Sequence, residues 1–331
     1  MGVIGNTVSF IKDKTVKACA FIADKLIPDS VYNNKVDKNW DGKFLPNCDN
    51  CDKPDNIATS CNADIYKGSE TEPSTGKKPG KGCDRNPMPK VYFINGINNT
   101  PQENCSATKA IAKATCSEVI GVYNRTQGMI TDLFECLGNI FNIHPFGGDI
   151  PTNKIKDILV NSINSNEPVT ILAHSQGGLI TREAINEAKK KLSEESLMSD
   201  SEIEALMGEN TNIISLGTAE YNWPKGPNYE QFTHPKDIVP KIISGADSLT
   251  MPSPLIGDMP NPNYMEEMEA YNSLMANIPS EKKHVVDTRD KNGKEFGVGT
   301  DAHNMEISYA PALAKQRKND NGYKCEICPN K

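Results

Sequence analysis

The stretch PVTILAHSQGG, residues 168–178, decides which fold we expect of this chain. Residues 168–173 form a short apolar run, which is typical of a parallel strand that is buried on both faces. A helical pattern follows directly, over residues 178–192. The sequence therefore predicts that a strand turns abruptly into a helix at residues 174–177.

Strand and helix patterns alternate on both sides of this turn. Thr100 and Glu103 match the capping-box pattern, which predicts a helix beginning at residue 100. Alternating strands and helices imply βαβ units and a mainly parallel sheet. We therefore expect an α/β fold, with a central sheet flanked by helices. The expected strands are 91–94, 119–123, 168–173, 212–216, 229–233 and 284–288, and the expected helices are 100–116, 126–142, 154–163 and 178–192.

Composition divides the chain into three parts. Residues 1–89 are expected to form an amphipathic helix over residues 8–27 and then an irregular, cysteine-rich appendage with a linker. That helix either docks on the main domain, which we favour, or lies on a membrane surface. Residues 90–310 form the α/β domain, with an insertion at about 249–283, and residues 311–331 form a charged tail.

The net charge and the hydropathy exclude several classes of protein. The chain has 331 residues and a formal net charge of -7, which argues against nucleic-acid binding because such proteins need a basic face. No segment approaches the roughly 20 apolar residues that a membrane-spanning helix requires. Lys12, Lys14 and Lys17 interrupt the stretch in which a secretion signal has its apolar core, so we expect no Sec signal.

The ten cysteines point to an oxidising destination or to a metal, since disulfides are rare in cytosolic proteins. Cys48 and Cys51 form one C-x-x-C pair, and Cys325 and Cys328 form another. Four thiolates in two such pairs would bind a structural zinc ion in tetrahedral geometry. The alternative, which we favour, is disulfides within or between these pairs and with Cys61 or Cys83.

Ser175 lies in the predicted turn between strand and helix. Ala173 and Gly177 flank it as A-x-S-x-G, and small residues at these positions allow a tight turn that projects the hydroxyl clear of the sheet. The N-terminus of the following helix favours developing negative charge. This pattern predicts that Ser175 is a nucleophile.

Two segments, VYFINGINNTP at residues 91–101 and VTILAHSQGGLI at residues 169–180, resemble the lipase and esterase branch of the bacterial α/β-hydrolases. The resemblance extends over residues 90–310 and implies the α/β-hydrolase fold. It also implies an oxyanion hole made by the backbone N–H groups of Ile97 and Gln176. Asn95 stands where His is commoner in the family, and we expect its side chain to cap the turn.

The resemblance also implies the order of a catalytic triad, with serine first, the acid second and histidine last. The segment HPKDIVP, residues 234–240, resembles the D-x-V-P segment that carries the acid, which implies Asp237, with Asp258 as a competitor. His303 lies on a loop after the last strand and fits the position of the base. The other histidines, which we do not expect to take the proton, are His144, His174, His234 and His284.

A serine hydrolase of this kind forms an acyl-enzyme and needs no metal or organic cofactor for catalysis. The insertion between acid and base is rich in methionine, and such flexible side chains suit a lid over an acyl chain, although ordinary helix core is the alternative. The expected substrate is a lipid ester, either a glycerolipid or a phospholipid, met at a membrane surface. The rival functions are a small-ester or thioester hydrolase, an acyltransferase, and a catalytically silent binding module. The candidate lid residues are Met251, Met259, Met265 and Met268.

The family includes antibacterial lipase effectors that type VI secretion delivers without a cleavable signal. Such a route would reconcile the cysteines with the missing signal, and it implies a secretion-apparatus or immunity protein as partner. We therefore expect the periplasm of a target cell or the extracellular space, with the cytoplasm as the alternative.

Overall fold

The computed structural model describes residues 44–45, 90–96, 99–115, 117, 119–124, 150–218, 220, 222–237, 239–240, 278–290, 292–297 and 301–321. Several predictions concern residues outside these ranges and stay predictions. They are the helices at 8–27 and 126–142, the cysteine pairs Cys48, Cys51, Cys325 and Cys328, the oxyanion residue Ile97, the competing acid Asp258, His144, and the lid residues Met251, Met259, Met265 and Met268.

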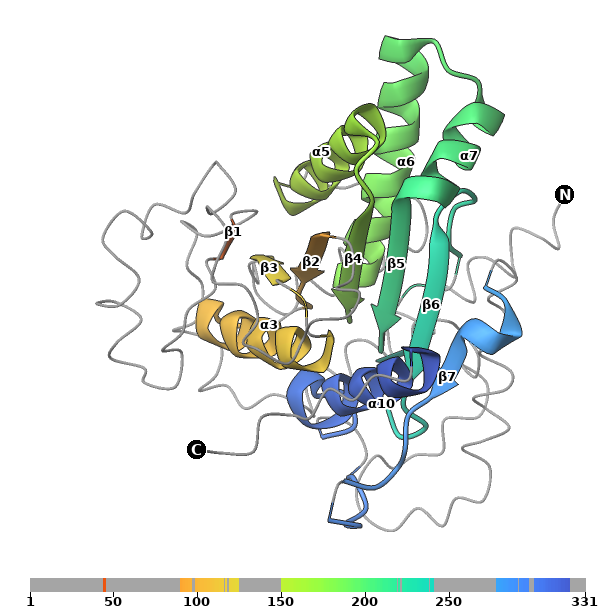
Figure 1. The fold of residues 1–331 in the computed structure, drawn as a ribbon. Coiled ribbons are helices and arrows are strands. Elements are labelled where there is room, and N and C mark those ends of the chain that lie inside the picture. The colour runs from red at the N-terminus through yellow and green to blue at the C-terminus, as the bar shows by residue number, and fades with distance from the viewer. Residues whose placement is uncertain are drawn as a thin grey trace, which may run out of the picture.

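A sheet of seven strands in the described residues forms the centre of the protein (Figure 1). The strand order is β1-β3-β2-β4-β5-β6-β7, and all neighbours are parallel except β1 and β3. The predicted α/β class with a mainly parallel sheet is therefore confirmed. The strands are β1 (Phe44–Leu45), β2 (Lys90–Ile94), β3 (Val119–Val122), β4 (Val169–His174), β5 (Thr211–Leu216), β6 (Asn228–Thr233) and β7 (Lys283–Val285).

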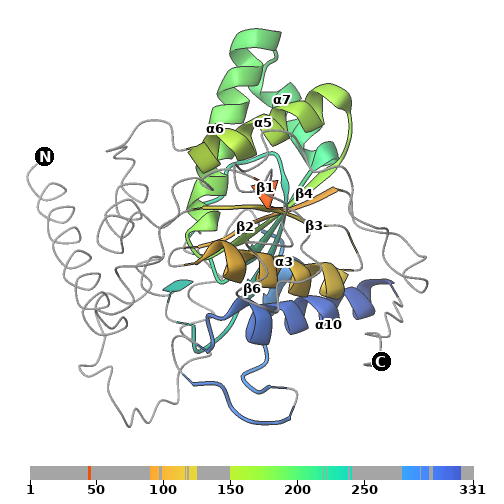
Figure 2. The same ribbon diagram turned by 90° about the vertical axis from the view of Figure 1, so that its left-hand side faces the viewer.

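Helices cover both faces of this sheet (Figure 2). On one face α3 packs against α10, and on the other α5, α6 and α7 pack together. Among the helices of the described residues, none combines the length and the apolar composition that crossing a bilayer demands. The helical segments are α3 (Pro101–Thr115), α5 (Ile150–Ser165), α6 (Gly177–Ser196), α7 (Asp200–Asn210), the 3-10 turn η4 (Ser280–Lys282), the π-helical turn η5 (Met305–Tyr309) and α10 (Ala310–Asn321).

The start of α3 confirms the predicted capping box. The Thr100 hydroxyl accepts a hydrogen bond from the Glu103 N–H at 3.1 Å, and the Glu103 carboxylate accepts one from the Thr100 N–H at 2.6 Å. Both contacts satisfy amides that the first helical turn leaves unpaired. These two hydrogen bonds thus define the residue at which α3 begins after β2.

Two helices were not expected from the sequence. α7 follows α6 after a short break and begins with a capping box between Ser199 and Glu202. α10 begins at Ala310, where we expected a charged tail, and it belongs to the α/β unit because Leu313 is fully buried in the core. Its remaining residues are largely polar, so the apolar stripe is too short to stand out in the sequence.

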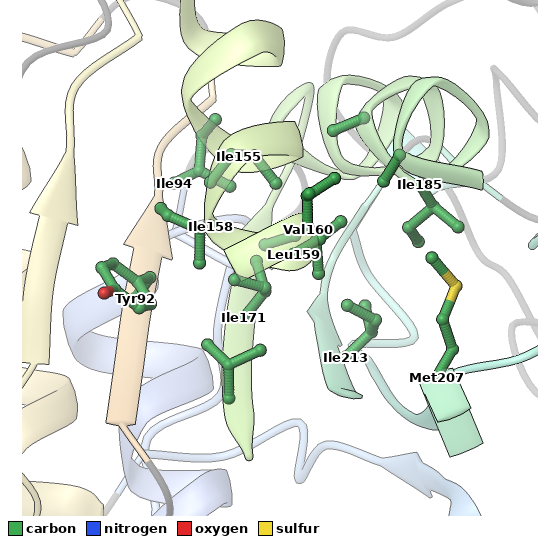
Figure 3. Packing of buried hydrophobic residues seen from close by; sticks show 14 of the residues in the cluster. Tyr92, Ile94, Ile155, Ile158, Leu159, Val160, Ile171, Ile185, Met207 and Ile213 are labelled. Atoms are coloured by element: carbon green, nitrogen blue, oxygen red, sulfur yellow. The ribbon is translucent and has the colours of Figure 1, made fainter. Parts of the chain in front are cut away.

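The core consists of two apolar layers, one on each face of the sheet. In β2, Tyr92 and Ile94 point into one layer while Val91 and Phe93 point into the other, as the two-residue period of a strand requires. Burial on both faces explains why the strand is a continuous apolar run. This packing fixes the carboxyl ends of β2, β4, β5 and β6, where the candidate site lies. Figure 3 shows the α5 and α6 side of the core, with Tyr92, Ile94, Ile155, Ile158, Leu159, Val160, Ile171, Ile185, Met207 and Ile213 in contact.

Candidate active site

Ser175 lies directly after β4 and before α6, in the predicted sharp turn. Its backbone φ is +57°, in the left-handed region, which costs an ordinary L-residue about 1–2 kcal/mol. A β-carbon on Gly177 would approach the backbone carbonyl oxygen of Ile94 to 2.6 Å, so the turn requires a small residue there. The structure thus holds a strained serine at the end of a central strand, which is the local geometry that A-x-S-x-G predicts.

The turn after β2 lies against this serine. A β-carbon on Gly96 would lie 2.4 Å from the Cβ of Ser175, so the two backbones approach as closely as a glycine allows. The buried Asn95 amide donates to the carbonyl oxygens of Gly96 and Asn124, and its oxygen accepts from the Asn124 N–H, all at 2.8 Å. Asn95 therefore ties the ends of β2 and β3 together, which agrees with the expected turn-capping role.

Gln176, the predicted oxyanion donor, is held in place through its side chain. Its side-chain oxygen accepts a hydrogen bond from the Asn124 amide at 2.9 Å. Gln176 is the N-cap of α6, and its backbone N–H has no partner among the described residues, as is usual for amides at the start of a helix. An unpaired amide beside Ser175 is available to an oxyanion. The second predicted donor, Ile97, lies outside the described residues.

Asp237 follows β6 and is fully buried. Its Oδ2 accepts hydrogen bonds from His303 Nδ1 at 2.7 Å and from the Tyr309 hydroxyl at 2.6 Å, and its Oδ1 accepts one from the Val239 N–H at 2.9 Å. Burial opposes ionisation of this carboxyl, but the charge and hydrogen bond of His303 and the other two donors outweigh it, so the pKa of Asp237 lies below its usual value. Asp237 is therefore an ionised, triply bonded acid.

His303 lies between β7 and the π-helical turn η5, and it contacts Asp237 across 66 residues of sequence. The next residue, Asn304, caps η5 by accepting hydrogen bonds from the N–H groups of Glu306 and Ile307 at 2.8 and 3.1 Å. An ionised Asp237 can only accept, so Nδ1 of His303 carries a proton, and in the neutral imidazole the lone pair is then on Nε2. This is the tautomer that a general base needs.

His174 connects the His303–Asp237 pair to the turn that carries Ser175. Its ring stacks on the ring of His303, with centroids 4.6 Å apart, and it immediately precedes Ser175. Among the described residues, the His303 imidazole bonds to Asp237 through Nδ1, and no hydrogen bond joins it to the Ser175 hydroxyl. Nucleophile and base commonly tighten their contact only when substrate binds. The structure thus brings Ser175, His174, His303 and Asp237 into one region.

Two other histidines take structural positions. Nε2 of His284 donates to the Glu230 carboxylate at 2.9 Å, and its ring packs at a tilt against Phe232. Arg317 of α10 donates to the same carboxylate at 3.2 Å. His234 is fully buried, and burial lowers its pKa to about 4. Neither imidazole is hydrogen-bonded to the carboxylate of Asp237, which bonds to the imidazole of His303.

Tyr309 is a site residue that the sequence did not reveal. Its hydroxyl donates to Asp237 and accepts from the His234 N–H at 3.3 Å, and its side chain is fully buried. A tyrosine near the end of a helical segment carries no recognisable motif. The local feature that marks Tyr309 comes from the structure: it lies in a π-helical turn, and such turns concentrate at functional sites.

The described residues contain no group of side chains that could hold a metal ion. The four cysteines of the zinc hypothesis lie outside this part of the chain. Cys105, at the buried side of α3, is disulfide-bonded. The disulfide alternative for the two C-x-x-C pairs stays a prediction.

Comparisons of the chain with protein-family models, with curated proteins and with solved structures find no match.

Substitution of Gly96 by alanine is expected to lower activity more than stability. The new methyl group would push the β2 turn away from Ser175, and a displacement of about 1 Å at a reacting group costs on the order of 100-fold in rate. Gly297→Ala is the matched control, since its nearest neighbour would be 3.5 Å away at Asp301. Ester hydrolysis and urea unfolding of both variants provide the measurement, and equal activities would contradict the expectation.

Proposed function

We propose that this protein is a serine hydrolase of the α/β-hydrolase type that cleaves carboxylic esters through an acyl-enzyme. The observation that carries the proposal is the hydrogen bond between Asp237 and His303, whose ring stacks on the residue that precedes the strained Ser175. An acid that fixes an imidazole next to a serine on a strand-to-helix turn is the constellation that activates a serine hydroxyl.

The reaction begins when Nε2 of His303 takes the proton of the Ser175 hydroxyl. The serine oxygen then forms a bond to the acyl carbon, and the carbonyl oxygen becomes an oxyanion. The backbone N–H of Gln176, with that of Ile97 as the predicted second donor, stabilises this charge, and each such donor contributes about 3 kcal/mol. His303 returns the proton to the leaving alcohol as the ester C–O bond breaks, and Asp237 stabilises the imidazolium throughout.

Water completes the cycle. His303 accepts a proton from water, whose oxygen attacks the acyl carbon, and the bond to the Ser175 oxygen breaks as that oxygen takes the proton back. The products are a carboxylic acid and free enzyme. No step requires a group beyond these side chains and backbone amides.

The proposed substrate is a lipid ester, either a glycerolipid or a phospholipid. The support is the methionine-rich segment between Asp237 and His303, whose side chains suit an adaptable apolar lid. The disulfide at Cys105 supports an oxidising destination, as expected of an exported effector.

Labelling with a fluorophosphonate probe, followed by mass spectrometry of the modified peptide, tests the proposal. We expect the label on Ser175, because the probe reacts with activated serines. A protein that is folded yet unlabelled would leave only the binding-module function. Hydrolysis rates of nitrophenyl esters of increasing chain length then test the substrate class, and a preference for acetate or butyrate would exclude the lipase assignment while leaving the esterase in place.

A further inference from the structure

We infer that His174 is a positioning residue, which holds the imidazole of His303 in the orientation that accepts the proton of Ser175. The inference rests on the proposed function, because it assigns a role relative to that nucleophile. It concerns the residue between Ala173 and Ser175, which the A-x-S-x-G pattern leaves open.

Two contacts connect His174 to His303. Nε2 of His174 lies 2.9 Å from the backbone carbonyl oxygen of His303, although the two residues are 129 positions apart. The two rings also stack, with centroids 4.6 Å apart and planes inclined by 30°. One side chain of the serine turn therefore contacts both the main chain and the ring of the base.

The direction of the first contact follows from its chemistry. A carbonyl oxygen only accepts hydrogen bonds, so Nε2 of His174 is protonated and donates. Burial, together with the neighbouring charge of His303, lowers the pKa of His174 to about 3, so its ring is neutral at physiological pH. A neutral ring can stack on His303 without repelling the imidazolium that forms during catalysis.

These contacts complete the restraints on His303. The bond from Nδ1 to Asp237 fixes one ring atom but leaves the ring free to pivot about that bond. Stacking on His174 fixes the plane of the ring, and the bond to the carbonyl oxygen fixes the backbone that carries it. Together the three restraints determine where Nε2 points, and because His174 precedes Ser175, they set that direction relative to the nucleophile.

Tyr309 supports the same arrangement from the other side. Its ring meets His174 edge-on, with centroids 5.9 Å apart, while its hydroxyl bonds to Asp237. His174 thus contacts both the base and a residue that bonds to the acid. Space filling alone would require a ring at this position, but it would not require a hydrogen-bond donor.

The test compares His174→Phe, which keeps a ring but loses the donor, with His174→Gln, which keeps a donor but loses the stack. We expect kcat to fall in both variants, because each one misplaces the base slightly. The expected loss is about 100-fold in His174→Phe and smaller in His174→Gln. KM is expected to stay within about twofold in each, since His174 is not placed against substrate. The control is His284→Phe, which removes a half-buried histidine that bonds to Glu230 rather than to the site.

A spectroscopic measurement separates positioning from general destabilisation. The Nδ1 proton shared by His303 and Asp237 gives a downfield proton resonance, which we expect in the wild type and in His284→Phe, and expect to be shifted or broadened in both His174 variants. Should His174→Phe fail to fold, His174→Gln decides alone.

Each result bears on one claim. Wild-type kcat and an unchanged resonance in the His174 variants would overturn the positioning role, as would a loss confined to KM. Absence of probe labelling at Ser175 in the wild type would remove the proposed function instead, and the resonance would still report whether His174 orients His303.

Discussion

Replacement of Ser175 by alanine is expected to lower kcat for ester hydrolysis by a factor on the order of 10⁶, close to the loss of all serine-dependent catalysis. The reason is chemical, since the variant has no oxygen that can form the acyl-enzyme. The residual rate comes from binding and from the oxyanion amides, which the substitution leaves in place. Steady-state hydrolysis of a nitrophenyl ester, with probe labelling in parallel, measures both effects.

Ser175→Gly adds a measurement of stability at the same position. Both variants lack the nucleophile, but only glycine adopts a φ of +57° without steric cost. We expect Ser175→Gly to be more stable than Ser175→Ala by about 1 kcal/mol in urea unfolding. The comparison shows whether the strain of the serine turn is maintained for activity at the expense of stability.

A different outcome would point elsewhere. If Ser175→Ala kept more than about a hundredth of the wild-type rate, another group would be the nucleophile, because losing a triad serine costs far more. If glycine and alanine were equally stable, the turn would not be strained in solution.

The sequence predicted most of the sheet because its strands are short apolar runs buried on both faces. The expected strand at 91–94 corresponds to β2 (Lys90–Ile94), and that at 168–173 corresponds to β4 (Val169–His174). Burial on both faces leaves a signal that lies entirely within a few consecutive residues. The serine turn was predictable for the same reason, since strand, small residues and helix are contiguous.

Contacts between distant segments were much harder to predict. The bond from Tyr309 to Asp237 spans 72 residues, and that from His174 to His303 spans 129. Neither tyrosine nor histidine carries a local pattern that names its partner. Helix α10 was missed because a single turn of apolar residues, including Leu313, anchors a helix that is otherwise polar. Such features depend on the topology of the sheet, which brings the carboxyl ends of β4 and β6 close to the loop after β7.

Asp237→Asn is expected to lower kcat by about 10⁴-fold while leaving KM nearly unchanged. Asp237 accepts three hydrogen bonds, whereas an asparagine amide has one oxygen and one NH₂ group. If the NH₂ group faces His303, the ring must present a bare Nδ1 and carry its proton on Nε2. That tautomer cannot take the proton of Ser175. Asp301→Asn, at an exposed position two residues before the base, is the matched control and is expected to keep wild-type kcat.

The same substitution has a signature in the pH dependence of stability. The pKa of Asp237 lies below its unfolded value of about 3.9, so its ionised form stabilises the fold above that pH, and this contribution is lost as the pH falls through the folded pKa. The asparagine variant lacks the contribution at neutral pH and therefore loses less stability on acidification than the wild type. Urea unfolding at pH 7 and at successively lower pH measures the difference. A variant with nearly wild-type kcat and an unchanged acid response would show that Asp237 is not the acid, and Asp258, the competing carboxylate, would then be the residue to substitute.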